Sequence, residues 1–197
     1  MSIIWGDTIG LRPFEDPVSD AEAERVFRWS RDDAVLHWSG GVATELTLDE
    51  FRDHLRGERW HAPINRRAFF ILTRANELIG RIGVFAMDRE QRDGELGIII
   101  GEPTQWGKHY GRDAVRTLLR HVFTTTMLER VYLFTFNENI RAQNCFRACG
   151  FRPLGAKRRF SPDVGEYDGI EMEITRREFL ERRAPISVAL AAQFETR

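Results

Sequence analysis

A turn rich in glycine and basic residues carries the clearest chemistry in this sequence. It spans residues 106–112, holds Lys108, His109 and Arg112, and lies between an apolar stretch and an amphipathic run at 111–126. Where a turn opens a helix, its free main-chain N–H groups and nearby cations form a site for phosphate. The turn by itself fits an ordinary helix start equally well, so the flanking elements must decide.

The apolar stretch before the turn, residues 94–100, is expected to be a strand. Glu95, Gly97 and Ile99 would share one face of it. A glycine inside an apolar strand marks a bulge or a close approach by another backbone. A strand distorted at Gly97 would splay from a parallel neighbour at 131–137. The wedge between two such strands, at their carboxyl ends, is where α/β sheets usually bind ligands.

Composition bounds the class of protein. The chain has 197 residues, 42% of them hydrophobic and 30% charged, which is typical of a globular domain. A formal net charge of −1 argues against a nucleic-acid binder. We find no secretory signal and no apolar run of the ~18 residues that a membrane helix needs, so we expect a cytoplasmic protein. Cys145 and Cys149, four apart in an expected helix, should be reduced, and no metal site is expected.

The pattern of elements predicts an α/β (α+β) fold. We expect a mixed, mostly antiparallel, twisted sheet of about seven strands, flanked by helices and splayed at the fourth and fifth strands. Residues 32–44 are expected to be irregular. The expected strands cover 8–14, 67–73, 78–87, 94–100, 130–137, 151–160 and 169–175, and the expected helices cover 20–29, 48–60, 111–126 and 140–148.

Several motifs in order resemble those of the GCN5-related N-acetyltransferase (GNAT) superfamily over residues 8 to about 178. The family turn Arg/Gln-x-x-Gly-x-Gly/Ala stands here as Trp-Gly-Lys-His-Tyr-Gly at 106–111. The later family pattern appears as Asn-Ile-Arg-Ala from Asn139, then Phe146, then Gly150 and Phe151. The branch that the chain resembles most contains ribosomal-protein N-terminal acetyltransferases and spermidine acetyltransferases.

The resemblance implies acetyl-CoA as co-substrate and direct acetyl transfer to an amine. Ile98 and Ile100 would pair through their main chain with the pantetheine arm. Asn139 would contact the cofactor beyond the strand at 131–137, and Glu95 would be the water-linked base. The diphosphate would lie on the turn, whose residues are Trp106, Gly107, Lys108, His109, Tyr110, Gly111 and Arg112. Glu95 fits a solvated or ion-paired strand carboxylate equally well.

Two positions depart from the family pattern. His109 replaces the central glycine of the turn, so the turn must tolerate a side chain or direct it to solvent. Phe146 replaces the tyrosine that protonates the leaving thiolate, although a thiol with a pKa of about 8.5 is a fair leaving group. Neutralising a lysine-type amine at pH 7 costs roughly 4–5 kcal/mol, whereas an α-amine costs only about 1 kcal/mol. A site without the acid therefore favours a protein N-terminal α-amine.

The acceptor is expected to bind residues 30–66 and the loop 160–168. Aromatic and acidic residues there could receive a cationic amine, or form an ordinary amphipathic surface: His37, Trp38, Trp60, His61, Asp32, Asp33, Glu45 and Asp49. A small amine, such as a polyamine or an aminoglycoside, is the alternative acceptor. A non-catalytic acyl-CoA-binding protein is the rival class.

We expect one N-acetyltransferase domain at 1–178 and an extension at 179–197. Val188, Leu190 and Phe194 give this extension an apolar side. It should therefore pack on its own domain or on a second subunit, which would make the protein a homodimer.

Overall fold

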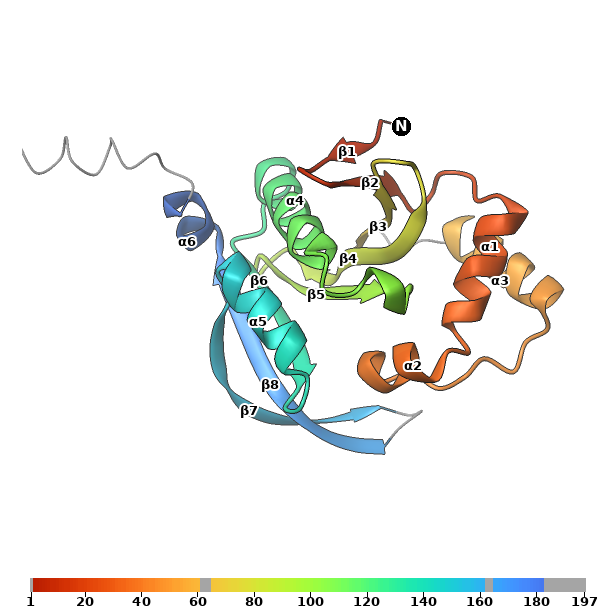
Figure 1. The fold of residues 1–197 in the computed structure, drawn as a ribbon. Helices are drawn as coiled ribbons and strands as arrows, with labels where there is room; N and C mark the ends of the chain where they lie inside the picture. Colours follow the sequence, from red (N-terminus) through yellow and green to blue (C-terminus); the bar gives the residue numbers. More distant parts are fainter. Residues whose placement is uncertain (1, 61–64, 162–164, 183–197) are drawn as a thin grey trace, which may run out of the picture.

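An eight-stranded sheet forms the centre of the protein, in a computed structural model that describes residues 2–60, 65–161 and 165–182 (Figure 1). The strand order is β1-β2-β3-β4-β5-β6-β8-β7, and among the described strands only β5 and β6 pair in parallel. This confirms the expected fold class, with one strand beyond the expected seven. The strands are β1 (Ile4–Trp5), β2 (Ile9–Pro13), β3 (Arg67–Thr73), β4 (Leu78–Asp88), β5 (Asp93–Ile100), β6 (Arg130–Phe136), β7 (Arg152–Ser161) and β8 (Gly165–Thr175).

Helices cover both faces of this sheet and enclose two separate cores. Buried residues of α4 and α5 pack with one face, and those of α1, α2 and α3 pack with the other (Figure 1). Each helix buries its apolar face and leaves its polar face to solvent, as the helical periodicity predicts. The helices are α1 (Asp20–Trp29), α2 (Asp33–Ser39), α3 (Leu48–Trp60), α4 (Tyr110–Thr125), α5 (Ile140–Cys149) and α6 (Arg176–Glu181), with a 3-10 turn η1 (Pro103–Gln105).

Helix α2 corrects the expectation that residues 32–44 are irregular. The Asp32 side chain accepts a hydrogen bond from the Val35 N–H (3.0 Å) and caps the helix start. Gly40 ends the helix with φ 69°, a left-handed conformation that glycine adopts without strain. The segment is short and only Val35 is buried, so its periodicity is too weak to read from the sequence.

The two parallel strands diverge where the sequence predicted a splay. Their pairing covers Asp93 to Glu95 of β5 and ends at the pair Glu95–Tyr132. Beyond that pair β5 continues to Ile100 beside β4 only. The main-chain groups on its other edge therefore have no strand to bind.

Gly97 is not the site of the distortion. It pairs in register with Gly83, and the irregularity falls on β4 between Phe85 and Asp88, where Ala86 has φ 47°. The Phe85 ring lies over the two glycines: a Cβ on Gly97 would be 3.2 Å from this ring, and one on Gly83 2.9 Å. Gly97 thus accommodates a ring, not another backbone.

The last strands form a hairpin longer than expected. Strand β8 begins at Gly165, so residues 165–168 of the expected loop are strand, and residues 162–164 lie outside the described residues. Helix α6 includes residue 178, where the sequence placed the end of the domain. Its buried Phe179 packs against Phe123 of the main core. Residues 183–197 are not described, so the packing of the C-terminal extension stays a prediction. Within the described segments, no helix is both long and apolar enough to cross a membrane.

Candidate active site

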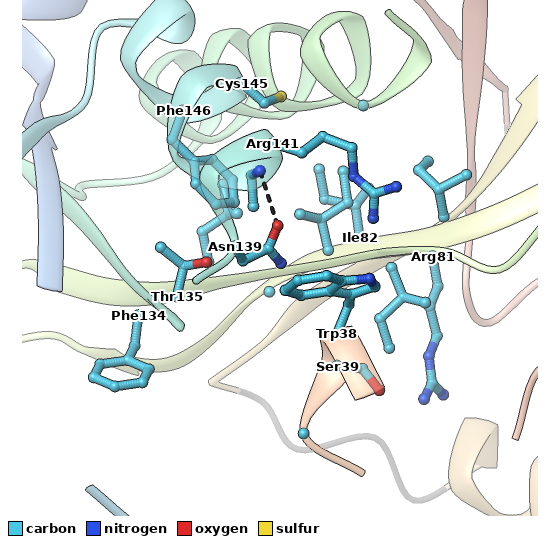
Figure 2. A pocket seen from close by; sticks show the side chains of 18 of the residues that line it. Trp38, Ser39, Arg81, Ile82, Phe134, Thr135, Asn139, Arg141, Cys145 and Phe146 are labelled. Carbon is cyan, nitrogen blue, oxygen red and sulfur yellow. Dashed lines mark hydrogen bonds between the residues drawn. The ribbon is translucent and has the colours of Figure 1, made fainter. Parts of the chain in front are cut away.

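A cleft of about 800 Å³ opens where β5 and β6 diverge. Strands β3 to β8, helix α2, the turn before α4 and the start of α5 all contribute to its wall. Figure 2 shows part of this wall, with Trp38 of α2 and Asn139 before α5 among the labelled side chains. The wall contains every residue predicted for the site except Lys108: Glu95, Ile98, Ile100, Trp106, Gly107, His109, Tyr110, Gly111, Arg112, Asn139 and Phe146. Lys108 is exposed beside the cleft, and its Nζ donates to Gln105 Oε1 (2.9 Å).

The turn at one end of the cleft presents unsatisfied amides. Helix α4 begins at Tyr110, and its N-cap residue His109 provides no side-chain cap. The first backbone bond of the helix is from Asp113 N–H to His109 O (3.1 Å), so the amides of residues 110–112 have no acceptor in the described backbone. His109 has φ 66° and an exposed side chain, and Gly107 has φ 77°. The turn thus tolerates the His109 substitution by directing its imidazole outward.

Arg112 adds a charged donor to the same end of the cleft. Its Nε is buried without a hydrogen-bond partner among the described residues. An unpaired buried donor is costly, and a phosphate oxygen is the partner that a guanidinium binds best. The open amides, the helix start and this donor together fit the diphosphate of a coenzyme.

The edge of β5 supplies polar main-chain groups to the middle of the cleft. Gly101 N–H donates to Ile79 O (2.9 Å), so the alternation along the antiparallel pair turns the groups of Ile99 and Gly97 toward β4. The main-chain groups of Ile98 and Ile100 then face the gap beside β6. The carbonyl of Ile100 already accepts the Trp106 indole N–H (2.8 Å), so Ile98 has the more accessible groups.

Asn139 stands across the gap, at the start of α5. Its Oδ1 accepts the Ala142 N–H (3.1 Å) and caps the helix, as the dashed line in Figure 2 shows. Its side-chain NH₂ therefore remains to face the cleft. Arg141, which the sequence reading missed, places its guanidinium 3.9 Å from the centre of the Trp106 ring and so connects the two walls.

The predicted base, Glu95, lies on the face of the sheet that α1 to α3 cover. Arg159 Nη1 donates to Glu95 Oε1 at 2.5 Å, and the Arg159 guanidinium lies 4.8 Å from the centre of the Phe134 ring. Both charged side chains are partly exposed to the cleft, at 32% for Glu95 and 24% for Arg159. The two readings of Glu95 therefore coincide: it is ion-paired, and it also faces the cavity.

The position of the missing acid holds Phe146, which is buried against Phe151. The thiol of the preceding residue, Cys145, also lines the cleft, and both cysteines are free. A hydrogen bond from Cys149 lowers the pKa of Cys145, aided by Arg112 and Arg116, although burial opposes it. The same hydrogen bond and burial raise the pKa of Cys149.

The acceptor side of the cleft differs from the sequence expectation. Trp38 lines it, but the acids predicted for acceptor binding do not: Asp32 caps α2, Asp49 pairs with Arg52 (2.9 Å), and Asp33 and Glu45 are absent from the cleft wall. The Trp60 side chain and His61 fall outside the described part. Strands β3, β4, β5 and β7, with the residue before β3, instead contribute a group that we call the arginine chamber: Arg66, Ala68, Arg81, Phe85, Glu95, Gly97 and Arg159.

Comparisons with known proteins agree with this geometry. The acetyltransferase (GNAT) domain pattern matches residues 9–152. An N-acetyltransferase 9-like protein of Caenorhabditis briggsae is 22% identical over 80% of this chain and 83% of its own. The spermidine N(1)-acetyltransferase of Vibrio cholerae is 31% identical over 53% of this chain and 59% of its own. The crystal structure of the V. cholerae spermidine N-acetyltransferase with CoA and spermine superposes with a TM-score of 0.72 at 21% identity, covering 87% of this chain and 98% of that one.

The chain belongs to the GNAT acetyltransferase family, because the domain pattern covers most of its length. It is an acetyl-CoA-dependent N-acetyltransferase that acts on an amine. The fold, the cleft and the family thus agree on the reaction. Which amine is acetylated depends on the residues at the acceptor side of the cleft.

Proposed function

We propose that this enzyme transfers the acetyl group of acetyl-CoA to the α-amine of a protein N-terminus. One observation carries the proposal: Glu95 is the sole carboxylate among the described residues of the cleft wall, and it is bound to an arginine. An α-amine has a pKa near 7.7–8.0 and is partly neutral at pH 7, so it needs little help to become a nucleophile. A lysine or polyamine amine, with a pKa near 10.4, needs far more.

The residues that hold the co-substrate follow from the unsatisfied groups of the cleft. The amides of residues 110–112 and the Arg112 side chain would bind the diphosphate, while the main chain of Ile98 would pair with the pantetheine amides. The Asn139 amide would donate to the same arm from the other wall. Acetyl-CoA supplies a thioester whose sulfur leaves as a thiolate.

Glu95 would remove the proton of the attacking amine, directly or through one water. Its position on the cleft wall supports this role, since a general base must reach the amine from the wall of the site. Arg159 would keep the carboxylate turned toward the amine through the 2.5 Å hydrogen bond. A carboxylate already paired with an arginine suits an amine that needs little help to lose its proton.

Two alternatives remain open to test. The V. cholerae relative is a spermidine acetyltransferase, so a polyamine or another small amine such as an aminoglycoside is the second candidate acceptor. A non-catalytic acyl-CoA-binding role is the third, suggested by Phe146 at the position of the acid. The homodimer and the cytoplasmic location expected from the sequence stay predictions.

The test is a CoA-thiol release assay over short peptides with varied N-termini, polyamines and aminoglycosides, with mass spectrometry of each product. We expect acetylation at the peptide α-amine, and a loss of about 10²–10⁴-fold in kcat for Glu95→Gln with little change in acetyl-CoA affinity. The matched control is Glu45→Gln, an exposed carboxylate outside the cleft wall. Faster turnover of polyamines than of every peptide would refute the proposal. Tight acetyl-CoA binding without any turnover would instead favour the non-catalytic role.

A further inference from the structure

The arginine chamber has a floor of small residues. Ala68 of β3, Gly83 of β4 and Gly97 of β5 stand side by side in register across three strands. On a pleated sheet such neighbours project to the same face. The Phe85 ring lies along this floor, against Gly83 and Gly97. The ring therefore fills the space above these two glycines and forms an apolar base to the chamber.

Three guanidinium groups surround this floor. Arg67 pairs with Val84, so the register places Arg66 opposite Phe85, in the same row as Glu95. Arg81 pairs with Ile99, one row beyond the floor on the other side. Arg159 reaches the chamber from β7 on the far side of the gap.

Arg159 is best placed to contact a ligand directly. Its Nη1 donates to Glu95, and stacking on Phe134 fixes the plane of its guanidinium. No acceptor for its Nε or Nη2 lies among the described residues. Arg66 and Arg81 each engage another group of the protein, so they act chiefly through their charge.

The charge of the cleft is strongly positive. The described part of the cleft wall contains five arginines and a single carboxylate, Glu95. Arg112 and Arg141 belong to the coenzyme end, which leaves Arg66, Arg81 and Arg159 around the acceptor. A polycation that entered this chamber would meet like charges at close range, whereas an anion would be attracted.

We propose that the acceptor carries a carboxylate close to the amine that is acetylated, and that Arg159, with Arg66 and Arg81, binds that carboxylate. This inference rests on the proposed acetylation of an α-amine; a preference for free alanine over every peptide would replace the protein N-terminus as the acceptor. The carboxylate has two sources: an Asp or Glu side chain in the first residues of a protein, or the α-carboxylate of a free amino acid. In either case the guanidinium can bind it through paired N–H groups while Glu95 stays beside the amine.

A second hollow of about 440 Å³ adjoins the main cleft and shares Trp38, Phe136 and Tyr167 with it. Glu138 and Asp168 line it, and Asp168 accepts a hydrogen bond from Arg158 Nε (2.9 Å). These acids, unlike the arginine chamber, would attract a cationic group of an acceptor. A polyamine is therefore the acceptor that the experiment below compares with the anionic acceptors.

The experiment compares paired acceptors with and without the anion, as kcat/KM per neutral amine, because a neighbouring carboxylate raises the pKa of the amine. One pair is a peptide that begins with Asp against the same peptide that begins with Asn; the other is alanine against alaninamide; spermidine is the polycation. We expect kcat/KM to favour the carboxylate member by about ten-fold or more in at least one pair, and to be lowest for spermidine. The pair that shows the preference identifies the source of the carboxylate.

Variants assign the preference to the chamber. Arg159→Gln should bring the two members of the pair within about two-fold, and Arg81→Gln should reduce the preference several-fold. Arg177→Gln, an exposed arginine of α6, is the matched control and should keep it. Acetyl-CoA affinity, measured by calorimetry, reports whether each variant is folded.

Each result has a distinct meaning. Equal or better turnover of the amide members or of spermidine overturns this inference while leaving the enzyme an acetyltransferase. A carboxylate preference that survives both arginine variants overturns the assignment to the chamber. Acetyl-CoA binding without acetylation of any acceptor overturns the proposed function itself.

Discussion

Replacing Arg112 tests the coenzyme end of the cleft most sharply. The Arg112 Nε is buried and has no partner among the described residues, and it lies beside the open amides of α4. A hydrogen bond between a charged donor and a phosphate contributes about 1.5–3 kcal/mol, so Arg112→Gln should weaken acetyl-CoA binding about ten- to a hundred-fold. Because no described residue accepts a hydrogen bond from the buried Nε, the substitution should change the free energy of unfolding little.

The assay is isothermal titration calorimetry at fixed salt, with two ligands. One is acetyl-CoA, and the other is acetyl-pantetheine, which lacks the diphosphate and should bind Arg112→Gln as it binds the unmodified protein. Arg116→Gln is the control on the same helix, because Arg116 is exposed and donates to Ala148 O (2.8 Å) away from the cleft wall. Equal losses for both ligands, or an acetyl-CoA Kd within two-fold of the unmodified protein, would refute the reasoning.

Three further predictions concern the thiolate, the cysteine pair and the N-terminal strand. Phe146→Tyr supplies the missing acid and should raise kcat about ten-fold below pH 8.5 but little above it; a pH profile of unchanged shape would exclude that role. Because its pKa is lowered, Cys145 should react with iodoacetamide before Cys149, whose pKa is raised, and acetyl-CoA should protect it; peptide mass spectrometry distinguishes the two thiols. Burial opposes the charged form of Asp113, but hydrogen bonds from Thr8 and its neighbours outweigh it and lower the pKa of Asp113. Its stabilisation is present above the unfolded pKa near 3.9 and is lost as the pH falls through the folded pKa, so Asp113→Asn should cost about 1 kcal/mol in urea unfolding at pH 7 and nothing near pH 2; equal costs at both pH values would contradict this.

Helices whose ends are set by neighbouring residues were predicted correctly from the sequence. Helices α1 and α3 have the predicted bounds, and Thr47 and Glu50 form the predicted capping box, with bonds of 2.8 and 3.3 Å. Such caps act within four residues of chain, so the sequence alone encodes them. Helix α2 was not predicted, because its 7 residues give fewer than two full turns of the helical pattern.

The coenzyme end of the site was equally accessible to sequence reasoning. The turn, the strand before it and the Asn139 cap are contiguous motifs, and the fold brings them to one cleft. A motif of neighbouring residues keeps its geometry wherever its strand and helix are placed. The conformation of His109 and the position of the bulge on β4 were not readable, because they depend on how the chain meets its neighbours.

The acceptor end was decided by tertiary structure alone. Arg66, Arg81 and Arg159 are far apart in the sequence and sit among many other arginines, each balanced by nearby acid. Only the register of β3, β4 and β5 and the return of β7 bring them around Glu95. Charge in a sequence is a sum, whereas charge in a cleft depends on which side chains face it. The sequence by itself therefore determined the reaction, and the pairing of the strands decided the environment that the acceptor meets.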